Sequence, residues 1–414
     1  MKKIKFINFN ELFYQKNVKI VASNIDFYKR LKYIFLLILT LDLIRLQILL
    51  IGKKNVIELK KRMIKQYDFI EFFNNTINKK TVLIFEPRDC HNECTPGYTK
   101  YFIDLGYNVD ILMRYQGIDS FAYFNDSNEN IRVFLYNKLR EIKKRKKFNL
   151  IIKKYDYIML ETFFKEEKEL FKELHLYNNN SIFIFHEIEF FDKHFTKSKY
   201  FNKNRVWTLG NSSIGLQVNP HYFGNIPIKG KSKKTKFFLT STIKRDYKPL
   251  IESVNHLHKE NFNFEIIVTG RDSSFNSNSI SANISNYFIF NHHVSYSELY
   301  QLVDNSDYII ILLSPDNKYD EIYKTKKVTG SYQLSLGFNK PCLINKEFAY
   351  YYDFNSQNSL IYNDINLYSA MKKAILMHNT EYKKIQHNLQ IKKTELYNIS
   401  INNVKRAIEN LNNS

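Results

Sequence analysis

Short apolar runs alternate along this chain with longer stretches whose apolar residues recur at the spacing of a helix. The run Thr81–Phe85 leads through a polar loop to a helical stretch at Pro96–Asp104, and Asn108–Met113 follows as a second run. Short apolar runs bounded by turn residues are typical of strands buried in a parallel sheet. Further strands are predicted at residues 157–160, 181–185 and 205–209, and a helix at 165–175. This alternation predicts a doubly wound α/β domain over residues 81–228.

The same alternation restarts after a polar, charged and glycine-containing break at residues 229–236, which is the predicted linker. Strands are predicted at residues 237–241, 265–269, 308–313 and 341–344, helices at 247–260, 297–305 and 331–337, and a polar helical tail from about 365. A second α/β domain is therefore expected at residues 237–414. Two Rossmann-like domains of this kind face each other across a cleft, and ligands bind at the carboxyl ends of their strands.

Residues 1–80 are predicted to form a basic, mostly helical extension. Residues 33–51, the most hydrophobic stretch of the chain, are about long enough to span a bilayer. Asp42 and Arg45 lie inside this stretch, and each ionised group at mid-bilayer costs about 3 kcal/mol. Three readings stay open: a helix that packs on the protein or lies on a membrane surface, a spanning helix, and a helix buried in a soluble domain.

The composition limits the classes of partner and compartment. Apolar residues make up 44% of the 414 residues, which excludes extensive disorder. The net charge of +21 favours phosphorylated ligands and an anionic membrane surface. Nucleic acid is not expected, because the cations are dispersed and no nucleic-acid-binding motif is found. Three cysteines make no disulfide framework and indicate a reducing cytoplasm. Cys90, His91 and Cys94 lack a fourth ligand, so no metal site is predicted.

Polar residues follow two strands of the first predicted domain. The loop after the first strand carries His91 and Glu93 and reaches Gly97 where a helix begins, so that N–H groups point into the cleft and a ligand can approach closely. His186 and Glu187 follow a later strand. An imidazole beside a carboxylate can bind a sugar hydroxyl or transfer a proton. A plain loop connection and a structural histidine are the alternatives.

Cations follow successive strands of the second predicted domain and lead to a helix start. These candidate donor-binding residues are Arg245, Arg271, Lys324, Lys326 and Lys327, with Gly330 and Ser331 at the helix start. Gly97 of the first domain is the remaining candidate donor-binding residue. A leaving nucleoside diphosphate needs such charge compensation. Any single surface cation is more often only solvated, so the recurrence at three strand ends carries this prediction.

Several segments, in order, resemble those of bacterial GT-B glycosyltransferases. Pro96–Ile111 is similar to their glycine-rich loop, helix and second strand, and Phe183–Glu187 to their strand ending in His-Asp. Val218–Phe223 resembles the segment before their interdomain linker, Val294–Tyr300 their Val-Ser-x-x-Glu-Leu helix, and Gly330–Pro341 their donor-site helix. The resemblance is to family 4, from which the chain departs. That family usually carries a pair of Glu residues here, and the corresponding positions, near Lys326 and Leu334, are not acidic.

The resemblance implies a glycosyltransferase, of hexosyltransferase type, that uses a nucleotide-sugar donor and no bound metal or other cofactor. Its acceptor would be a glycan or a lipid-linked glycan in bacterial surface polysaccharide, lipooligosaccharide or glycoprotein assembly. The enzyme would be cytoplasmic and peripheral on the inner face of the plasma membrane. The cations would neutralise the diphosphate, His186 would bind the donor sugar or assist proton transfer with support from Glu187, and His91 and Glu93 would face the acceptor. A sugar-nucleotide epimerase of GT-B fold and a non-catalytic scaffold of a glycan-assembly complex are the alternatives.

Overall fold

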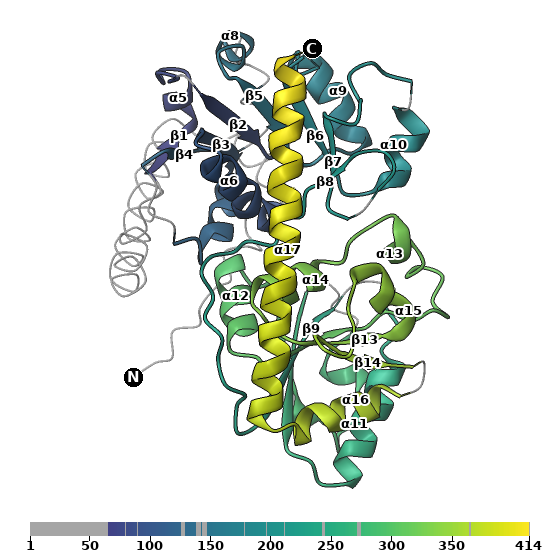
Figure 1. Cartoon of the computed structure of the whole chain (residues 1–414). Coiled ribbons are helices and arrows are strands. Elements are labelled where there is room, and N and C mark those ends of the chain that lie inside the picture. The colour runs from purple at the N-terminus through teal and green to yellow at the C-terminus, as the bar shows by residue number, and fades with distance from the viewer. Residues whose placement is uncertain are drawn as a thin grey trace, which may run out of the picture. The chain divides into compact units, whose positions relative to one another are not determined.

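Two parallel β-sheets, one after the other in the chain, make up the fold in the computed structural model (Figure 1). The structure describes residues 65–78, 80–88, 90–125, 129–137, 142, 147–177, 179–195, 197–210, 212–241, 245–270, 275–363 and 366–413. The hydrophobic stretch at 33–51 and the candidate Arg271 lie outside the described residues. Every strand pair in both sheets is parallel. The predicted α/β class with two Rossmann-like domains is confirmed.

The first sheet has the strand order β1-β4-β3-β2-β5-β6-β7-β8. Its strands are β1 (Lys65–Asp68), β2 (Thr81–Phe85), β3 (Asn108–Arg114), β4 (Ile131–Tyr136), β5 (Tyr157–Leu160), β6 (Ser181–Phe185), β7 (Val206–Thr208) and β8 (Leu216–Gln217). Its helices are α5 (Phe69–Phe72), η1 (Asn92–Cys94), α6 (Thr95–Asp104), η2 (Tyr115–Phe121), α8 (Phe148–Ile152), α9 (Lys165–Glu173) and α10 (Ile188–His194). Both faces of the sheet are covered by buried apolar clusters, which explains why β2, β5 and β6 are buried along their whole length and mostly apolar.

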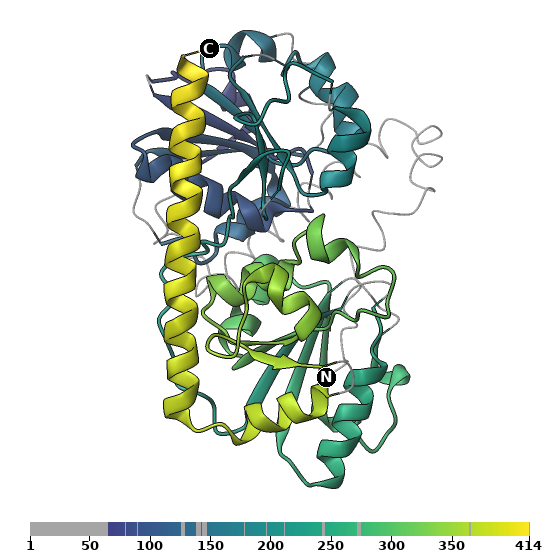
Figure 2. The same ribbon diagram turned by 45° about the vertical axis from the view of Figure 1, so that its right-hand side comes forward.

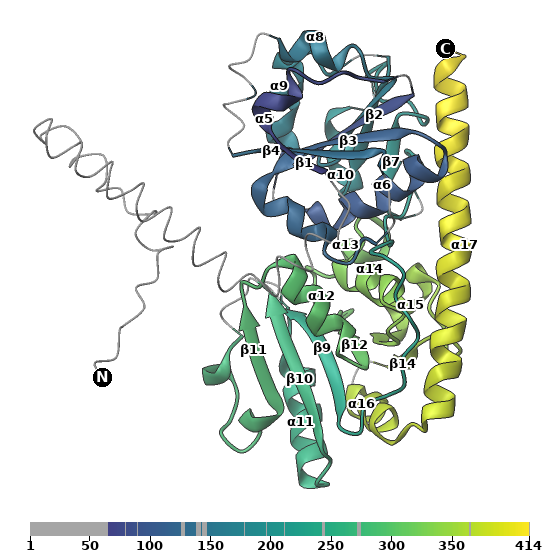
Figure 3. The same cartoon turned by 90° about the vertical axis from the view of Figure 1, so that its left-hand side faces the viewer.

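The second sheet has the strand order β11-β10-β9-β12-β13-β14. Its strands are β9 (Thr235–Ser241), β10 (Phe264–Gly270), β11 (Phe288–His292), β12 (Tyr308–Ile311), β13 (Cys342–Asn345) and β14 (Leu360–Tyr362). Its helices are α11 (Lys248–Lys259), η3 (Ser277–Ser279), η4 (Ser285–Tyr287), α12 (Tyr296–Asp304), α13 (Ile322–Thr325), α14 (Gly330–Gly337), α15 (Lys346–Ala349), η5 (Tyr350–Tyr352) and α16 (Leu367–Leu376). Figure 3 shows β9, β10 and β11 side by side, with α11 and α12 on their two faces.

The last helix, α17 (Asn379–Asn412), connects the two domains. Its beginning packs Tyr382 into the core of the second domain, and its end packs Val404 and Ile408 into the core of the first. Figure 2 shows the helix running alongside both sheets. The sequence assigns residues 237–414 to the second domain, but the last turns of α17 pack against the first domain. No helix among the described residues combines the length and the apolar character needed to cross a membrane.

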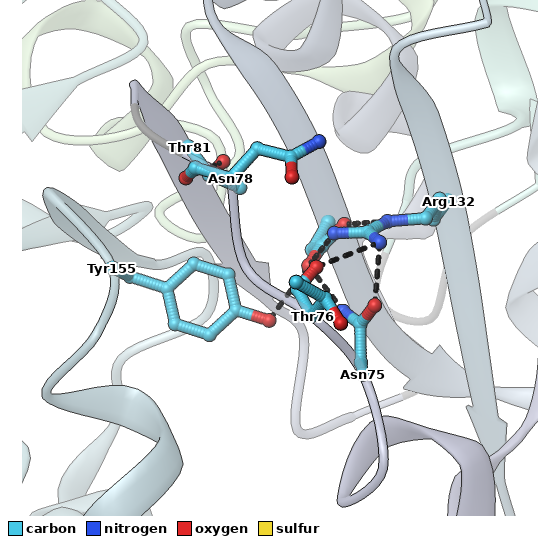
Figure 4. A network of polar contacts seen from close by, with 7 residues as sticks. Asn75, Thr76, Asn78, Thr81, Arg132 and Tyr155 are labelled. Carbon is cyan, nitrogen blue, oxygen red and sulfur yellow. Dashed lines mark hydrogen bonds and ion pairs between the residues drawn. The ribbon is translucent and has the colours of Figure 1, made fainter.

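The first sheet begins earlier in the chain than the sequence-based boundary at residue 80. The edge strand β1 pairs with β4 from Lys65 onward. Asn75, in the segment after β1, and Arg132 of β4 both donate hydrogen bonds to Asp110, a fully buried carboxylate in β3. Asp110 also accepts a hydrogen bond of 2.7 Å from Tyr155. Figure 4 shows Asn75, Arg132 and Tyr155 in this network. This network attaches the segment after β1 to the sheet, because a buried charge must be paired and hydrogen-bonded. Residues 65–78 thus belong to the first domain and not to an extension.

Candidate functional site

Three adjoining cavities lie where the carboxyl ends of strands from both sheets meet. The central cavity, of about 130 Å³, is lined from the first domain by His91, Glu93 and His186, and from the second by residues that include Arg245, Lys327, Gly330 and Ser331. A wide cavity of about 1030 Å³ shares Glu93, Thr240 and Gly330 with it. A third cavity, of about 410 Å³, shares His186 and Lys327 with it. Seven of the twelve residues that the sequence singles out as a site thus surround one space.

Two histidines from different strand ends are stacked in the central cavity. The rings of His91 and His186 lie 3.9 Å apart with an angle of 9° between them. His186 is buried, and its Nε2 lies 3.1 Å from the main-chain oxygen of Glu161. Burial and the neighbouring His91 lower the pKa of His186 well below its usual value, so this imidazole is neutral at physiological pH. Because Nε2–H donates to a carbonyl, Nδ1 is the acceptor that a ligand hydroxyl can use.

Glu93 links the two domains at the edge of the same cavity. Its carboxylate accepts a hydrogen bond of 2.9 Å from Tyr296 of α12, and its other oxygen lies 3.5 Å from Nδ1 of His91. Burial raises the pKa of Glu93, but the hydrogen bonds from His91 and Tyr296 outweigh it and lower the pKa overall. Glu93 is therefore an anionic acceptor beside His91, which is the arrangement of a base and the group that orients it.

Two further carboxyl groups, which the sequence analysis did not select, lie at the ends of β2 and β5. Glu86 and Glu161 are both fully buried. Glu161 accepts a hydrogen bond of 2.7 Å from Thr95, while its Oε1 has no partner among the described residues. Glu86 accepts from the backbone N–H of Arg88 at 2.6 Å and from Thr162. The available sequence signal was position alone, because each Glu directly follows a short apolar strand.

Burial raises the pKa of Glu86 to about 8, and this shift makes protein stability depend on pH. The folded state binds this proton more tightly than the unfolded chain. The stabilisation is therefore complete below about pH 4.5 and is lost as the pH rises through about 8. In urea denaturation between pH 5 and 8.5, we expect Glu86→Gln to gain stability relative to the wild type by on the order of 3 kcal/mol. Glu252→Gln, at an exposed position, is the control, and equal pH dependence in the wild type and Glu86→Gln would contradict this account.

The start of helix α14 provides a free end for an anion. Thr329 caps the helix without a side-chain hydrogen bond, and a Cβ built on Gly330 would meet no atom within 4 Å. Within the first turn the N–H of Tyr332 donates to the main-chain oxygen of Thr329 at 3.1 Å. The N–H groups that precede it at a helix start have no partner one turn earlier in the helix and attract negative charge. Gly330 lines both the central and the wide cavity. The helix start therefore faces open space between them.

Several buried polar atoms around these cavities have no hydrogen-bond partner among the described residues. They include both amide atoms of Gln333, one turn along α14, and the hydroxyl of Thr240 at the end of β9, which line the central cavity. Thr269 at the end of β10 has the same property in the wide cavity. A buried polar group without a partner costs about 1–3 kcal/mol. A polar ligand would supply the missing partners, and this is the signal that a linear sequence does not contain.

Arg245 reaches the central cavity from the loop after β9. Its guanidinium forms an ion pair with the buried Asp320 and lies over the ring of Tyr323, 5.4 Å from the centroid. Asp320 in turn accepts a hydrogen bond of 3.0 Å from the backbone N–H of Ser314. Burial raises the pKa of Asp320 although Arg245 lowers it. The ion pair fixes the orientation of the guanidinium, so the cation is already positioned when a second anion binds.

The three candidate lysines differ in position. Lys327 reaches the central cavity and pairs with Glu187 at 2.7 Å. Lys326 pairs with Glu189 across the same junction between the domains. Lys324 pairs with Glu321 at 2.9 Å and lines only the third cavity. Glu187 thus contacts a lysine of the second domain and does not support His186, whose partner is the main-chain oxygen of Glu161.

Gly97 requires a correction, because the structure gives it a packing role. A Cβ at this position would lie 2.6 Å from backbone atoms of Pro220, so only glycine lets helix α6 approach that segment. Gly97 is buried and lines none of the three cavities. Among the described residues, no three His, Cys, Asp or Glu side chains group so as to hold a metal ion. The expectation of a metal-free site stays a prediction.

Two Rossmann-like parallel sheets whose strand ends face each other across a cleft are the GT-B fold, and this chain has that fold. HepE of Anabaena is similar to it in two solved structures. The complex with UDP-glucose is 12% identical, with 81% of this chain and 100% of that chain covered at a TM-score of 0.52. The complex with UDP is 11% identical, with 81% and 100% covered at a TM-score of 0.50. No protein-family model and no curated protein sequence matches the chain.

Proposed function

We propose that this protein is a glycosyltransferase that takes a sugar from a nucleotide-sugar donor bound in the central and the wide cavity. One observation carries the proposal: a fixed cation, a free helix start and unpartnered polar side chains line the same central space. These are the side chain of Arg245, the first turn of α14, and the polar atoms of Gln333 and Thr240. Helix starts and arginine side chains recognise diphosphates, and amide and hydroxyl groups recognise sugars.

The donor has one orientation that suits the chemistry of the walls. The diphosphate occupies the space between Gly330 and Arg245, where a leaving nucleoside diphosphate gains negative charge. The nucleoside extends into the wide cavity, which begins at Gly330 and Thr240. The donor sugar lies under Nδ1 of the neutral His186 and beside the Gln333 amide. The solved HepE complexes with UDP-glucose and UDP support a donor of this class.

Proton removal from the acceptor hydroxyl falls to the His91–Glu93 pair in this proposal. Glu93 is anionic and lies 3.5 Å from Nδ1 of His91, so it orients the ring and stabilises the charge that the ring gains. His91 then accepts the proton of the attacking hydroxyl through its other nitrogen. The departing diphosphate is stabilised by Arg245, Lys327 and the N–H groups of α14 and needs no bound metal or other cofactor.

We propose that the acceptor is a glycan or lipid-linked glycan in bacterial surface polysaccharide, lipooligosaccharide or glycoprotein assembly. The net charge of +21 supports a peripheral position on an anionic inner membrane surface. We expect membrane-bound protein to be released by salt, because screening weakens attraction between exposed charges. Protein that stays on the membrane through high-salt and carbonate washes would contradict a peripheral position.

A panel of nucleotide-sugars tests the donor proposal. We expect one nucleotide-sugar to raise the melting temperature, because a ligand that binds only the native state stabilises it by mass action. At a concentration of 100 times Kd the gain is about 2.7 kcal/mol. Free nucleoside of the same base is the control and should act more weakly, since it lacks the diphosphate. If no nucleotide-sugar or nucleoside diphosphate shifts the melting temperature, the donor proposal fails and the scaffold alternative gains support.

A further inference from the structure

The third cavity, of about 410 Å³, adjoins the central one and has no part in the donor site proposed above. It joins the central cavity at His186 and Lys327 and shares no lining residue with the wide cavity. If the nucleoside occupies the wide cavity and the diphosphate the central one, as the proposed function has it, the third cavity offers a route to the reaction centre that neither of them occupies. An acceptor entering there would bring its hydroxyl past His186 toward His91.

The mouth of this cavity has two exposed aromatic rings. Tyr350 is 80% exposed and Tyr351 is 44% exposed, both on η5. Their ring centroids are 5.6 Å apart at an angle of 82°, so the two rings form an angular surface. Tyr350 is the most exposed of the large hydrophobic side chains among the described residues. A tyrosine ring can stack on an apolar surface while its hydroxyl forms a hydrogen bond. A pyranose ring offers both an apolar face and hydroxyl groups.

The charges along this cavity are already compensated within the protein. Its three lysines, Lys324, Lys326 and Lys327, are each paired with a glutamate. Asp353, also on the wall, pairs with Lys392 at 3.1 Å. An anionic ligand on this wall would compete with glutamates that already accompany the lysines, so it would gain little over a neutral ligand. The lysines of this wall are therefore balanced by nearby carboxylates, although the whole chain has a net charge of +21.

We propose that the third cavity binds a neutral sugar residue of the acceptor, stacked on Tyr350 and Tyr351. The inference rests on the proposed function for its biological meaning, but the binding itself depends only on this wall. The sugar ring lies against the tyrosine surface, and its reacting hydroxyl points toward the central cavity. A uronic acid or a sugar phosphate binds no more tightly in the same position and loses more hydration, because each of the three lysines on this wall already has a glutamate partner.

Saturation-transfer NMR and calorimetry on the full chain test the proposal with lactose, cellobiose, maltose and the acidic cellobiouronic acid. We expect at least one neutral disaccharide to bind, and cellobiouronic acid to bind more weakly than cellobiose. Tyr350→Ala and Tyr351→Ala should each weaken binding of the neutral sugar about tenfold, through loss of the stacking surface. Tyr350→Phe and Tyr351→Phe are the matched controls. They keep the ring and should bind within about threefold of the wild type, a difference below 1 kcal/mol.

Binding of a nucleoside diphosphate, measured on the same samples, separates the two proposals. Both tyrosines are exposed, so their alanine variants should keep the fold and bind the diphosphate like the wild type. The inference is overturned if no neutral disaccharide binds, if the alanine variants bind it unchanged, or if the acidic sugar binds more tightly. Sugar binding without diphosphate binding would instead remove the proposed donor site and leave the sugar site standing.

Discussion

Replacing Gly330 by aspartate should abolish binding of nucleoside diphosphates without loss of stability. A Cβ at this position meets open space, so the new side chain fits without moving its neighbours. A carboxylate in the first turn of a helix is favourable by about 0.3–1 kcal/mol. The same carboxylate would occupy the place of the diphosphate and repel it, and juxtaposed like charges cost several kcal/mol. Affinity measured by calorimetry should fall at least about 100-fold.

Gly330→Ala is the matched control for this change. It adds the same Cβ without the charge, so both stability and affinity should stay close to the wild type. Comparison of the two variants separates electrostatic exclusion from a steric effect. If Gly330→Asp binds the diphosphate as well as Gly330→Ala does, the start of α14 is not the phosphate site.

Replacing Arg245 by alanine should lower the rate of sugar transfer by roughly 30- to 1000-fold, equivalent to about 2–4 kcal/mol. Its guanidinium is held in the central cavity by Asp320, so it is positioned before the donor arrives. The contact strengthens as the diphosphate leaves, and its loss should therefore reduce kcat more than it raises KM.

Arg245→Lys is the conservative comparison and should keep part of the rate, since it restores one charge without the planar fork. Arg245→Ala also leaves Asp320 buried without its partner, so thermal unfolding must show that the variant is folded at the assay temperature. Arg406→Ala, at an exposed position on α17, is the control for loss of a cation. Equal rates for Arg245→Ala and the wild type would place the diphosphate elsewhere.

The strands that the sequence predicts well are those buried on both faces. β2, β5 and β6 coincide with the predicted ranges at 81–85, 157–160 and 181–185, because all but their first residues form unbroken apolar runs. The strands that were missed include the edge strands β1 and β11, which carry polar and partly exposed residues. In the missed β4, Arg132 interrupts the apolar pattern, and its charge is accommodated by Asp110 on the neighbouring strand. That pairing exists only once the chain is folded.

Site residues could be predicted from the sequence where they directly follow a predicted strand or begin a predicted helix. His91, His186, Arg245 and Gly330 all follow or precede predicted elements, and the structure brings them to one cavity. The partners of these residues were not predictable. Nothing in the sequence shows that Lys327 is paired with Glu187 of the first domain or that the Gln333 amide is buried without a partner among the described residues. Gly97 was misread because its contact with Pro220 spans more than 100 positions of the chain.

Release of nucleoside diphosphate from a nucleotide-sugar, followed with and without an acceptor glycan, tests the central claim most directly. The account predicts that release is slow with donor alone, rises when a neutral acceptor glycan is added, and is matched by an equal amount of glycosylated acceptor. Gly330→Asp should remove both products together. Conversion of the donor sugar into an epimer, with or without acceptor, would contradict sugar transfer, and so would a donor that binds but never yields free diphosphate.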